Sequence, residues 1–169
     1  TGIYGESGSG KSTIINILTG LIKPSEGKIV IDGENQLKLD DVRKYQNLFT
    51  VTSQDTYLLN GTIKENIIFG SNHKVSENRI IDSLDFSCLA ETLEDFPQGL
   101  DSQVGSNLKQ LSSGQKQRIS IARAIYNDRQ ILIFDEATNA LDEKNEKIIF
   151  QNIKKLKGKK TVIIISHNL

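Results

Sequence analysis

Apolar residues recur along this chain with two different periods, and each period predicts a different kind of element. Short runs that are continuous or that alternate with polar residues predict β-strands, whereas apolar residues three and four positions apart predict amphipathic helices. The predicted strands are residues 2–4, 28–32, 48–52, 131–134 and 161–165, and the predicted helices are residues 12–21, 40–45, 113–126 and 143–156.

Strand and helix patterns alternate near both ends of the chain, but the middle contains mainly helical spacing, as at Ile63, Ile67 and Ile68. The run at 131–134 is continuously apolar, as expected for a strand of a parallel sheet that is covered on both faces. These patterns predict an α/β fold with a mostly parallel sheet and an inserted α-helical subdomain. We expect residues 1–54 and 126–169 to form the core and residues 55–125 to form the insertion.

A glycine-rich loop lies between the first predicted strand and the first predicted helix. Its sequence, GESGSGKST, fits G-x-x-x-x-G-K-[ST], a pattern whose backbone amides bind phosphate when it joins a strand to a helix. Lys11 supplies a positive charge for the terminal phosphates, and Ser12 supplies a hydroxyl that can ligate Mg²⁺. The alternative, a flexible turn before an ordinary helix, does not account for this context. We therefore predict a P-loop NTPase core whose phosphate-binding residues are Gly5, Glu6, Ser7, Gly8, Ser9, Gly10, Lys11, Ser12 and Thr13.

Two carboxylates follow the apolar strand at 131–134. Asp135 would lie at the carboxyl end of a parallel strand beside the phosphate loop, which is a suitable position for holding Mg²⁺ through water. Glu136 would lie where the chain leaves the strand, and there it could orient or deprotonate the attacking water. The alternative for the pair is a helix or loop cap.

Gln54 and His167 carry weaker signals. Each follows a predicted strand that should end at the same edge of the sheet. At that edge Gln54 would contact the metal or the water, and His167 would donate a hydrogen bond to the γ-phosphate. The alternative for each is an ordinary polar residue at the surface.

The segment LSSGQ, which is Leu111, Ser112, Ser113, Gly114 and Gln115, precedes a predicted helix. Its serines can act as N-caps, or this helix N-terminus can be a second anion site. One nucleotide does not need two distant anion sites in one subunit, so a second site would serve a nucleotide held by another copy. Asp142, at the start of the next helix, is by default an N-cap and otherwise belongs to the same subunit boundary.

Composition narrows the functional classes. The chain of 169 residues has 21 basic and 21 acidic side chains, so it lacks the positive excess that is typical of nucleic-acid-binding domains. The single cysteine, Cys88, cannot form an internal disulfide, which is consistent with a reducing compartment. No segment approaches the roughly 18 apolar residues of a membrane span. The chain begins at Thr1 rather than Met, and we expect it to be a fragment of a longer protein.

Together these motifs resemble the nucleotide-binding domain of ATP-binding cassette (ABC) transporters, closest to the exporter type. In family terms, residues 5–13 match the Walker A loop, residues 131–136 match Walker B, and Leu111 to Gln115 match the signature. Gln54 matches the Q-loop, Asp142 the D-loop and His167 the switch histidine. The segment NGTIKENI at 60–67 resembles an exporter segment, and the motifs occur in family order over nearly the whole chain.

The resemblance implies ATP and Mg²⁺ as ligands, and two copies, or a copy and a paralogue, facing head to tail. Each ATP would lie between one subunit's Walker A loop and the other's signature. Glu136, Lys11, Gln54 and His167 would serve catalysis, and Ser12, Gln54 and Asp135 would serve the metal. Residues 54–67 would dock on a transmembrane domain, which places the chain at the cytoplasmic face of a membrane.

Two departures from the family pattern stand out. Ser113 replaces the first glycine of the usual LSGGQ, and we expect this change to be tolerated. Ser106 stands where a glutamate is usual in the family. The aromatic residue that stacks on adenine should lie upstream of Thr1.

The expected function is therefore ATP hydrolysis that powers export across a membrane. One alternative is a soluble ABC-type ATPase of DNA repair or translation, without a membrane partner. Another is a nucleotide-binding regulator that never hydrolyses, against which the presence of Glu136 and His167 argues. The sequence does not identify the cargo, nor whether the partner domain is identical.

Overall fold

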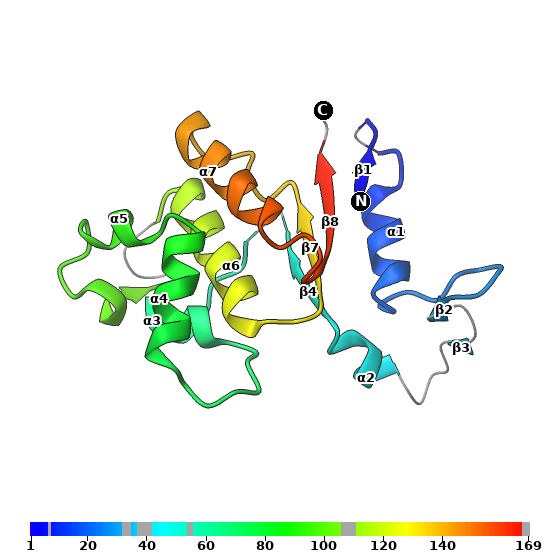
Figure 1. Cartoon of the computed structure of the whole chain (residues 1–169), viewed down its shortest axis with the longest axis horizontal. Coiled ribbons are helices and arrows are strands. Elements are labelled where there is room, and N and C mark those ends of the chain that lie inside the picture. Colours follow the sequence, from blue (N-terminus) through cyan, green and yellow to red (C-terminus); the bar gives the residue numbers. More distant parts are fainter. Residues whose placement is uncertain (7, 32–34, 37–41, 54–55, 106–110, 167–169) are drawn as a thin grey trace.

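The structure is a computed structural model, and it describes residues 1–6, 8–31, 35–36, 42–53, 56–105 and 111–166. Its main element is a four-stranded parallel sheet in the order β1-β8-β7-β4 (Figure 1). The four strands are β1 (Gly2–Tyr4), β4 (Phe49–Thr52), β7 (Ile131–Asp135) and β8 (Thr161–Ser166). The predicted mostly parallel sheet is confirmed.

The strand register brings the carboxyl ends of these strands to a common edge. Asp135 of β7 pairs with Ile165 of β8, and Ile165 pairs with Ile3 of β1. On the other side of β7, Phe134 pairs with Thr52 of β4. The residues that follow all four strands therefore emerge at one edge of the sheet, where parallel α/β proteins bind their ligands.

Helices cover both faces of the sheet. Helix α1 (Lys11–Leu18) lies on one face, where its Ile15 packs in a cluster with Ile133 and Ile163. Helices α6 (Ser113–Asn127) and α7 (Glu143–Lys154) lie on the other face (Figure 1). There Ile121 and Ile149 pack with Leu132 and Phe134. Alternate residues of β7 thus enter different cores, which explains its continuously apolar sequence.

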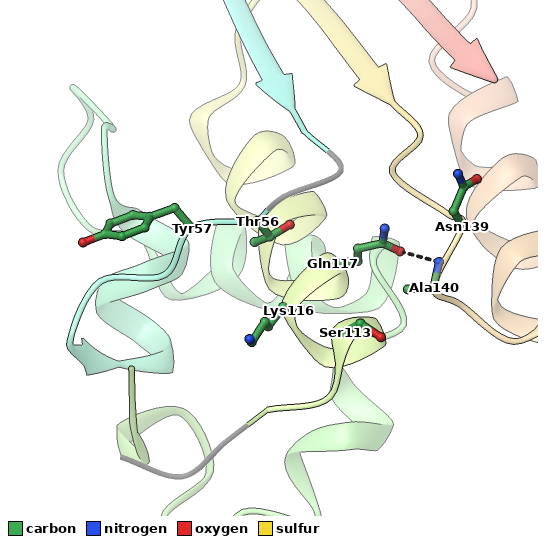
Figure 2. Close-up of a pocket in the computed structure, with 7 residues that line it drawn as sticks. All are labelled: Thr56, Tyr57, Ser113, Lys116, Gln117, Asn139 and Ala140. Atoms are coloured by element: carbon green, nitrogen blue, oxygen red, sulfur yellow. Dashed lines mark hydrogen bonds between the residues drawn. The ribbon is translucent and has the colours of Figure 1, made fainter. Parts of the chain in front are cut away.

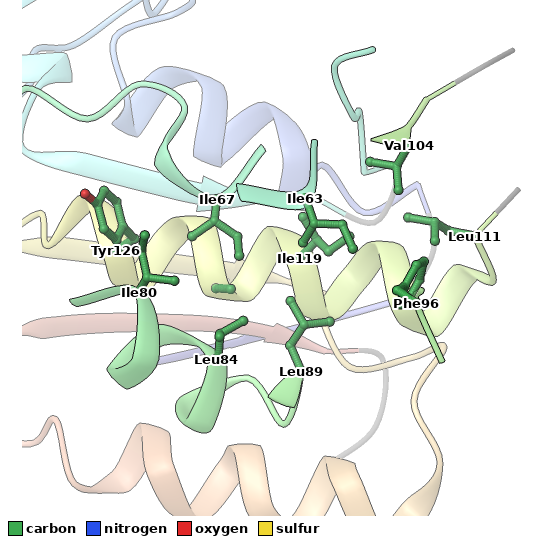
Figure 3. Packing of buried hydrophobic residues seen from close by; sticks show 11 residues of the cluster. Ile63, Ile67, Ile80, Leu84, Leu89, Phe96, Val104, Leu111, Ile119 and Tyr126 are labelled. Atoms are coloured by element: carbon green, nitrogen blue, oxygen red, sulfur yellow. The ribbon is translucent and has the colours of Figure 1, made fainter. Parts of the chain in front are cut away.

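A second core lies among the helices of the middle segment, shown in Figure 3. Helices α3 (Ile63–Ile68), α4 (Glu77–Phe86) and α5 (Ala90–Leu93) lie around α6 together with a 3₁₀ turn, η2 (Gly99–Asp101). A short antiparallel pair of strands, β5 (Gly61–Thr62) and β6 (Gln103–Val104), completes this part of the fold. The buried residues of this core come from four of these elements, α3, α4, β6 and α6, and from the loops between them: Ile63, Ile67, Ile80, Leu84, Leu89, Phe96, Val104, Leu111, Ile119, Ala122 and Tyr126.

Helix α6 belongs to both cores. Its Ile119, Ala122 and Tyr126 pack among the helices, while its Ile121 and Ile125 pack toward the sheet. The helical spacing predicted for the middle segment is confirmed, although Ile81 faces solvent.

Several predicted boundaries differ from the structure. The first helix begins at Lys11 and ends at Leu18, three residues before the predicted end. The Thr19 hydroxyl donates to the Ile15 carbonyl, and Gly20 adopts a left-handed φ of 72°, which stops the helix. The strand predicted at 28–32 shortens to β2 (Val30–Ile31), paired antiparallel with β3 (Asn35–Gln36), and the helical turn predicted at 40–45 is α2 (Val42–Gln46).

Candidate nucleotide site

The glycine-rich loop joins β1 to α1, as predicted. Gly8 and Gly10 have φ values of 80° and 89°, a left-handed conformation that most residues adopt only with strain. Lys11 is buried, and its ammonium donates to the carbonyl oxygens of Gly5 at 2.7 Å and Glu6 at 2.8 Å. The lysine therefore lies inside the curve of the loop, with its charge toward the concave side. Ser7 lies outside the described residues.

The loop has the chemistry that a phosphate requires. Gly10 is the N-cap of α1, and it has no side chain with which to cap the amides of the first turn. A Cβ built on Gly8 or Gly10 would meet no atom within 4 Å, so the space beside the loop is open. Backbone amides at a helix N-terminus, together with an ammonium, attract anions. The described residues of the loop thus fit a nucleotide phosphate.

Asp135 and Glu136 lie at the end of β7, two strands away from the glycine-rich loop. Glu136 is buried and has a φ of 51°, which is unusual for a residue other than glycine. Its N–H donates to the Ile165 carbonyl at 3.1 Å, and its Oε2 accepts from Asn139 Nδ2 at 2.9 Å. Glu136 does not cap a helix, because the N-cap of the helix that follows, α7, is Asp142. Its carboxylate does stabilise the loop, because it accepts the hydrogen bond from the Asn139 side chain.

Magnesium in nucleotide sites is usually held by one or two carboxylates or hydroxyls together with the phosphates, rather than by a cage of protein ligands. Within the described ranges, no group of three or more His, Cys, Asp or Glu side chains forms such a cage. Ser12 at the start of α1 and Asp135 at the end of β7 supply the hydroxyl and carboxylate oxygens that a phosphate-bound magnesium would need. The donor set therefore fits Mg²⁺.

The signature segment begins α6. Ser112 is the N-cap: its Oγ accepts from the Gln115 N–H at 3.1 Å, and Gln115 Oε1 accepts from the Ser112 N–H at 2.9 Å. This reciprocal pair is a capping box. Ser112 and Ser113 are exposed, whereas Leu111 and Gly114 are buried. The capping interpretation is confirmed, and the exposed serines leave this helix end accessible.

Asp142 caps α7 as predicted, since its Oδ1 accepts from the Asn145 N–H at 3.0 Å. Its Oδ2 lies 3.7 Å from Arg118 Nη2 of α6. Hydrogen bonds from the Asn145 side chain and backbone hold the pKa of Asp142 below its usual value. The carboxylate therefore stays ionised at neutral pH, facing the helix that carries the signature.

A cavity of about 590 Å³ lies between the start of α6 and the loop after β7 (Figure 2). Thr56 and Tyr57, which follow the position of Gln54, form another wall of it. The cavity thus brings together the segments that contain the predicted Q-loop, signature and D-loop. Its lining residues are Thr56, Tyr57, Ser113, Lys116, Gln117, Asn139 and Ala140.

Sequence reasoning missed Gln117 and Asn139. Asn139 donates to the Glu136 carboxylate, and the buried Gln117 side chain bonds to the backbone of both Glu136 and Ala140. A signal was present for Gln117, because Gly114, Gln117 and Ile121 lie on one helix face at positions i, i+3 and i+7. A polar residue on such a face is unusual. Gln54 and His167 lie outside the described residues, so their placement stays a prediction.

Comparisons with known proteins agree with this arrangement. The ABC transporter family profile matches residues 1–139. The chain is 43% identical over 169 residues to an ATP-dependent lipid A-core flippase of Idiomarina loihiensis, and the match covers 99% of this chain and 28% of the flippase. It is 39% identical over 168 residues to the ABC-type transporter fsqE of Aspergillus fumigatus, covering 99% of this chain and 13% of that protein.

A solved structure, titled as a bacterial Atm1-family ABC exporter with ATP bound, superposes with a TM-score of 0.91 at 35% identity. That match covers 99% of this chain and 29% of the exporter chain, so this chain spans less than a third of these relatives. No helix in the described part of the chain has the length and apolar character needed to cross a bilayer. The soluble ATPase alternative is not favoured, because the named relatives are transporters. The chain therefore belongs to the ABC transporter family, and it corresponds to the nucleotide-binding domain of the exporter type.

Proposed function

We propose that this chain binds ATP with Mg²⁺ and hydrolyses it, and that this hydrolysis drives export by the membrane transporter that contains it. The observation that carries the proposal is the common edge of the sheet. The loop that holds Lys11 follows β1, and Asp135 and Glu136 end β7, with only β8 between the two strands. A phosphate cradle and two carboxylates thus emerge at the same edge, as phosphoryl transfer requires.

Within one protomer, the loop amides and Lys11 hold the phosphates. Ser12, Asp135 and Gln54 are the residues that would hold Mg²⁺, which would supply positive charge to neutralise the phosphate oxygens. Glu136 orients the attacking water and takes its proton. His167 donates a hydrogen bond to the terminal phosphate. The buried position of Glu136 and its bond to Asn139 support its role, because they limit the directions in which its carboxylate can point.

The second half of the site comes from another protomer, an identical copy or a paralogue. Residues Leu111 to Gln115 would close over the partner's nucleotide, with Ser112 contacting its terminal phosphate and Asp142 at the same boundary. The exposure of Ser112 and Ser113 at the N-terminus of a 15-residue helix supports this assignment. Such a helix end favours negative charge.

Residues 54–67 would dock on the transmembrane domain, at the cytoplasmic face of the membrane. Exposed apolar rings on and near this segment support the assignment: Tyr57 is 75% exposed, and Phe69, one residue after α3, is 52% exposed. In this scheme residues 55–125 form a helical subdomain inserted between the two parts of the ATPase core, 1–54 and 126–169. The membrane domain selects the cargo, and the zero net charge gives no reason to expect nucleic acid as a partner.

The experiment that tests this function is Glu136→Gln in the full-length transporter. Binding of ATP should persist, whereas turnover should fall by about 100-fold or more, the contribution of a general base, and an ATP-bound dimer should accumulate. Glu143→Gln is a matched control, since Glu143 is an exposed carboxylate at the start of α7. Normal turnover in the Glu136→Gln protein would remove Glu136 from the mechanism.

A further inference from the structure

Helix α6 presents one continuous face to the loop that carries Glu136. Gly114, Gln117, Arg118 and Ile121 occupy this face at helical spacing. Gly114 touches the Ala140 peptide, and Arg118 faces Asp142. Deeper in the same interface, Ile121 packs in one cluster with Ala137. Ala137, Ala140 and Asp142 of the loop from residue 136 to residue 142 therefore lie against α6.

The Gln117 amide is the polar centre of this face. Its Nε2 donates to the Glu136 carbonyl at 3.3 Å, and its Oε1 accepts from the Ala140 N–H at 3.1 Å (Figure 2 shows the second bond). The side chain is only 4% exposed, so solvent does not compete for these bonds. The amide can be oriented in only one way, because reversing it would place N–H against N–H and oxygen against oxygen.

Two hydrogen bonds fix the backbone on both sides of the Glu136 Cα. The N–H of Glu136 is held by Ile165 of β8, and its carbonyl is held by Gln117 of α6. Glu136 adopts a left-handed backbone that is not its own preference, and such a conformation persists only where surrounding contacts determine it. Gln117 is therefore one of the contacts that set the direction of the Glu136 carboxylate.

We propose that Gln117 is a positioning residue that couples the two nucleotide sites of the dimer. This inference rests on the proposed function. The first turn of α6 would contact the nucleotide of the partner, and Gln117 lies one turn further along the same helix, bonded to the loop of its own protomer's Glu136. A small shift of α6 on closing over the partner's phosphate would reach the Glu136 and Ala140 peptides directly. Closure at one site would thus complete the water-activating geometry at the other.

The test compares three variants of the full-length transporter. Gln117→Leu removes both bonds with little change of shape. Gln117→Glu keeps the acceptor for the Ala140 N–H but has no donor for the Glu136 carbonyl. Asn127→Leu is the matched control, because Asn127 is an equally buried amide at the other end of α6, bonded to the Phe69 and Arg123 carbonyls.

Two measurements are made on each variant: kcat and KM for ATP, and hydrogen exchange of the amides between residues 136 and 142. In Gln117→Leu, kcat should fall by about 10-fold or more while KM changes by less than about 2-fold, as for a residue that orients a catalytic group. Exchange at Ala140 should become faster. Gln117→Glu should keep Ala140 protected and still lose kcat. Asn127→Leu should change neither kcat nor exchange at Ala140, whatever its effect on thermal stability.

Near-normal kcat in both Gln117 variants, or an equal loss in Asn127→Leu, would overturn the proposal. If Gln117→Leu fails to fold, Gln117→Glu decides alone: a reduced kcat with Ala140 still protected from exchange supports the proposal. If the unmodified transporter does not hydrolyse ATP, the proposed function fails, and exchange at Ala140 still decides whether Gln117 positions the loop. Faster exchange in Gln117→Leu supports that role, and unchanged exchange rejects it.

Discussion

Gly114 lies directly against the peptide of Ala140: a Cβ on Gly114 would be 2.9 Å from the Ala140 carbonyl oxygen. Real side chains essentially never approach backbone so closely, and a backbone carbonyl cannot turn aside as a flexible side chain can. The first turn of α6 and the loop before α7 therefore touch without an intervening side chain. Gly114, the one glycine of this signature, is therefore required by the loop of its own protomer, apart from any contact with a partner.

Replacing Gly114 with alanine should accordingly force α6 and the 136–142 loop apart. We expect Gly114→Ala to lower the free energy of unfolding by about 1–3 kcal/mol, the usual cost of an added methyl group in a packed interface. Urea unfolding measures this. Ser113→Ala is the control, because Ser113 is exposed at the adjacent position, and its effect on stability should stay within about 0.5 kcal/mol. Equal stabilities of the two variants would contradict the close approach.

Asn66 is a buried amide of the helical segment whose oxygen and nitrogen are both engaged in hydrogen bonds. Its Oδ1 accepts from the Leu59 N–H at 2.9 Å and from Arg123 Nη2 at 3.0 Å, and its Nδ2 donates to the Leu59 and Thr62 carbonyls. Asn66→Ala would leave the Leu59 peptide and the Arg123 guanidinium short of partners inside the protein. Because unsatisfied buried groups keep their full desolvation cost, we expect a loss of about 2–4 kcal/mol.

Chemical denaturation of Asn66→Ala, with Asn72→Ala as control, tests this expectation. Asn72 is exposed in the loop after α3, and its replacement should change stability by less than about 0.5 kcal/mol. A loss below about 1 kcal/mol in Asn66→Ala would mean that water replaces the amide, as it does for accessible groups.

The sequence was sufficient to predict the α/β class, the parallel sheet and the two motifs that begin helices at Lys11 and Ser113. Each of these follows from local information, either a hydrophobic period or a loop pattern next to a strand. Gln117 and Asn139 were missed because their roles depend on the packing of α6 against a loop that is distant in sequence. Glu136, for example, lies 19 residues after Gln117. Spacing within one helix does not reveal such a contact.

The basic turn near residues 157–160 shows the same limit. Composition predicts a solvated lysine surface, but Lys160 donates to the Asp128 and Arg129 carbonyls and pairs with the Asp128 carboxylate at 2.6 Å. Asp128 is 32 residues earlier in sequence and also pairs with Arg79 of α4. That carboxylate thus ties the helical core to the start of β8, a connection that only the tertiary structure reveals.

This ion-pair network predicts a pH dependence. Burial raises the pKa of Asp128, but the hydrogen bonds and charges of Lys160 and Arg79 outweigh it and hold the pKa below its ordinary value of 3.8. A lowered pKa in the folded state favours folding wherever the unfolded carboxyl is ionised. The stabilisation should therefore be fully present above pH 3.8 and should be lost as pH falls through the folded-state pKa below it.

Asp128→Asn measures that contribution. Asparagine tolerates the left-handed backbone of this position, φ 53°, so the change removes charge without adding strain. Because the carboxylate is 47% exposed, solvent screens the pairs, and we expect a loss of about 1 kcal/mol at pH 7. The difference from the unmodified protein should shrink in urea unfolding below pH 4. Glu143→Gln, which breaks an exposed pair with Lys147, should cost about 0.3 kcal/mol.

The proposed sharing of each site between two protomers predicts complementation between two inactive variants. Lys11→Ala removes the ammonium that we propose binds phosphate, and Ser112→Arg blocks the exposed start of α6. If each site joins one protomer's Lys11 to the other's Ser112, a mixed dimer of the two variants contains one intact site and one doubly damaged site. If both residues served the same protomer's nucleotide, the mixed dimer would contain no intact site.

Co-expression of the two variants with different tags, followed by purification through both tags, isolates the mixed dimer. Trapping of a labelled ATP analogue should be near zero in each variant alone and about half of the unmodified level in the mixed dimer, since a twofold dimer has two equivalent sites. Mixed dimers that trap nothing would place the signature and the cradle in one protomer's site. Failure to recover any doubly tagged protein would show instead that this chain does not pair with itself, and the same pair of changes would then be divided between the chain and its paralogue.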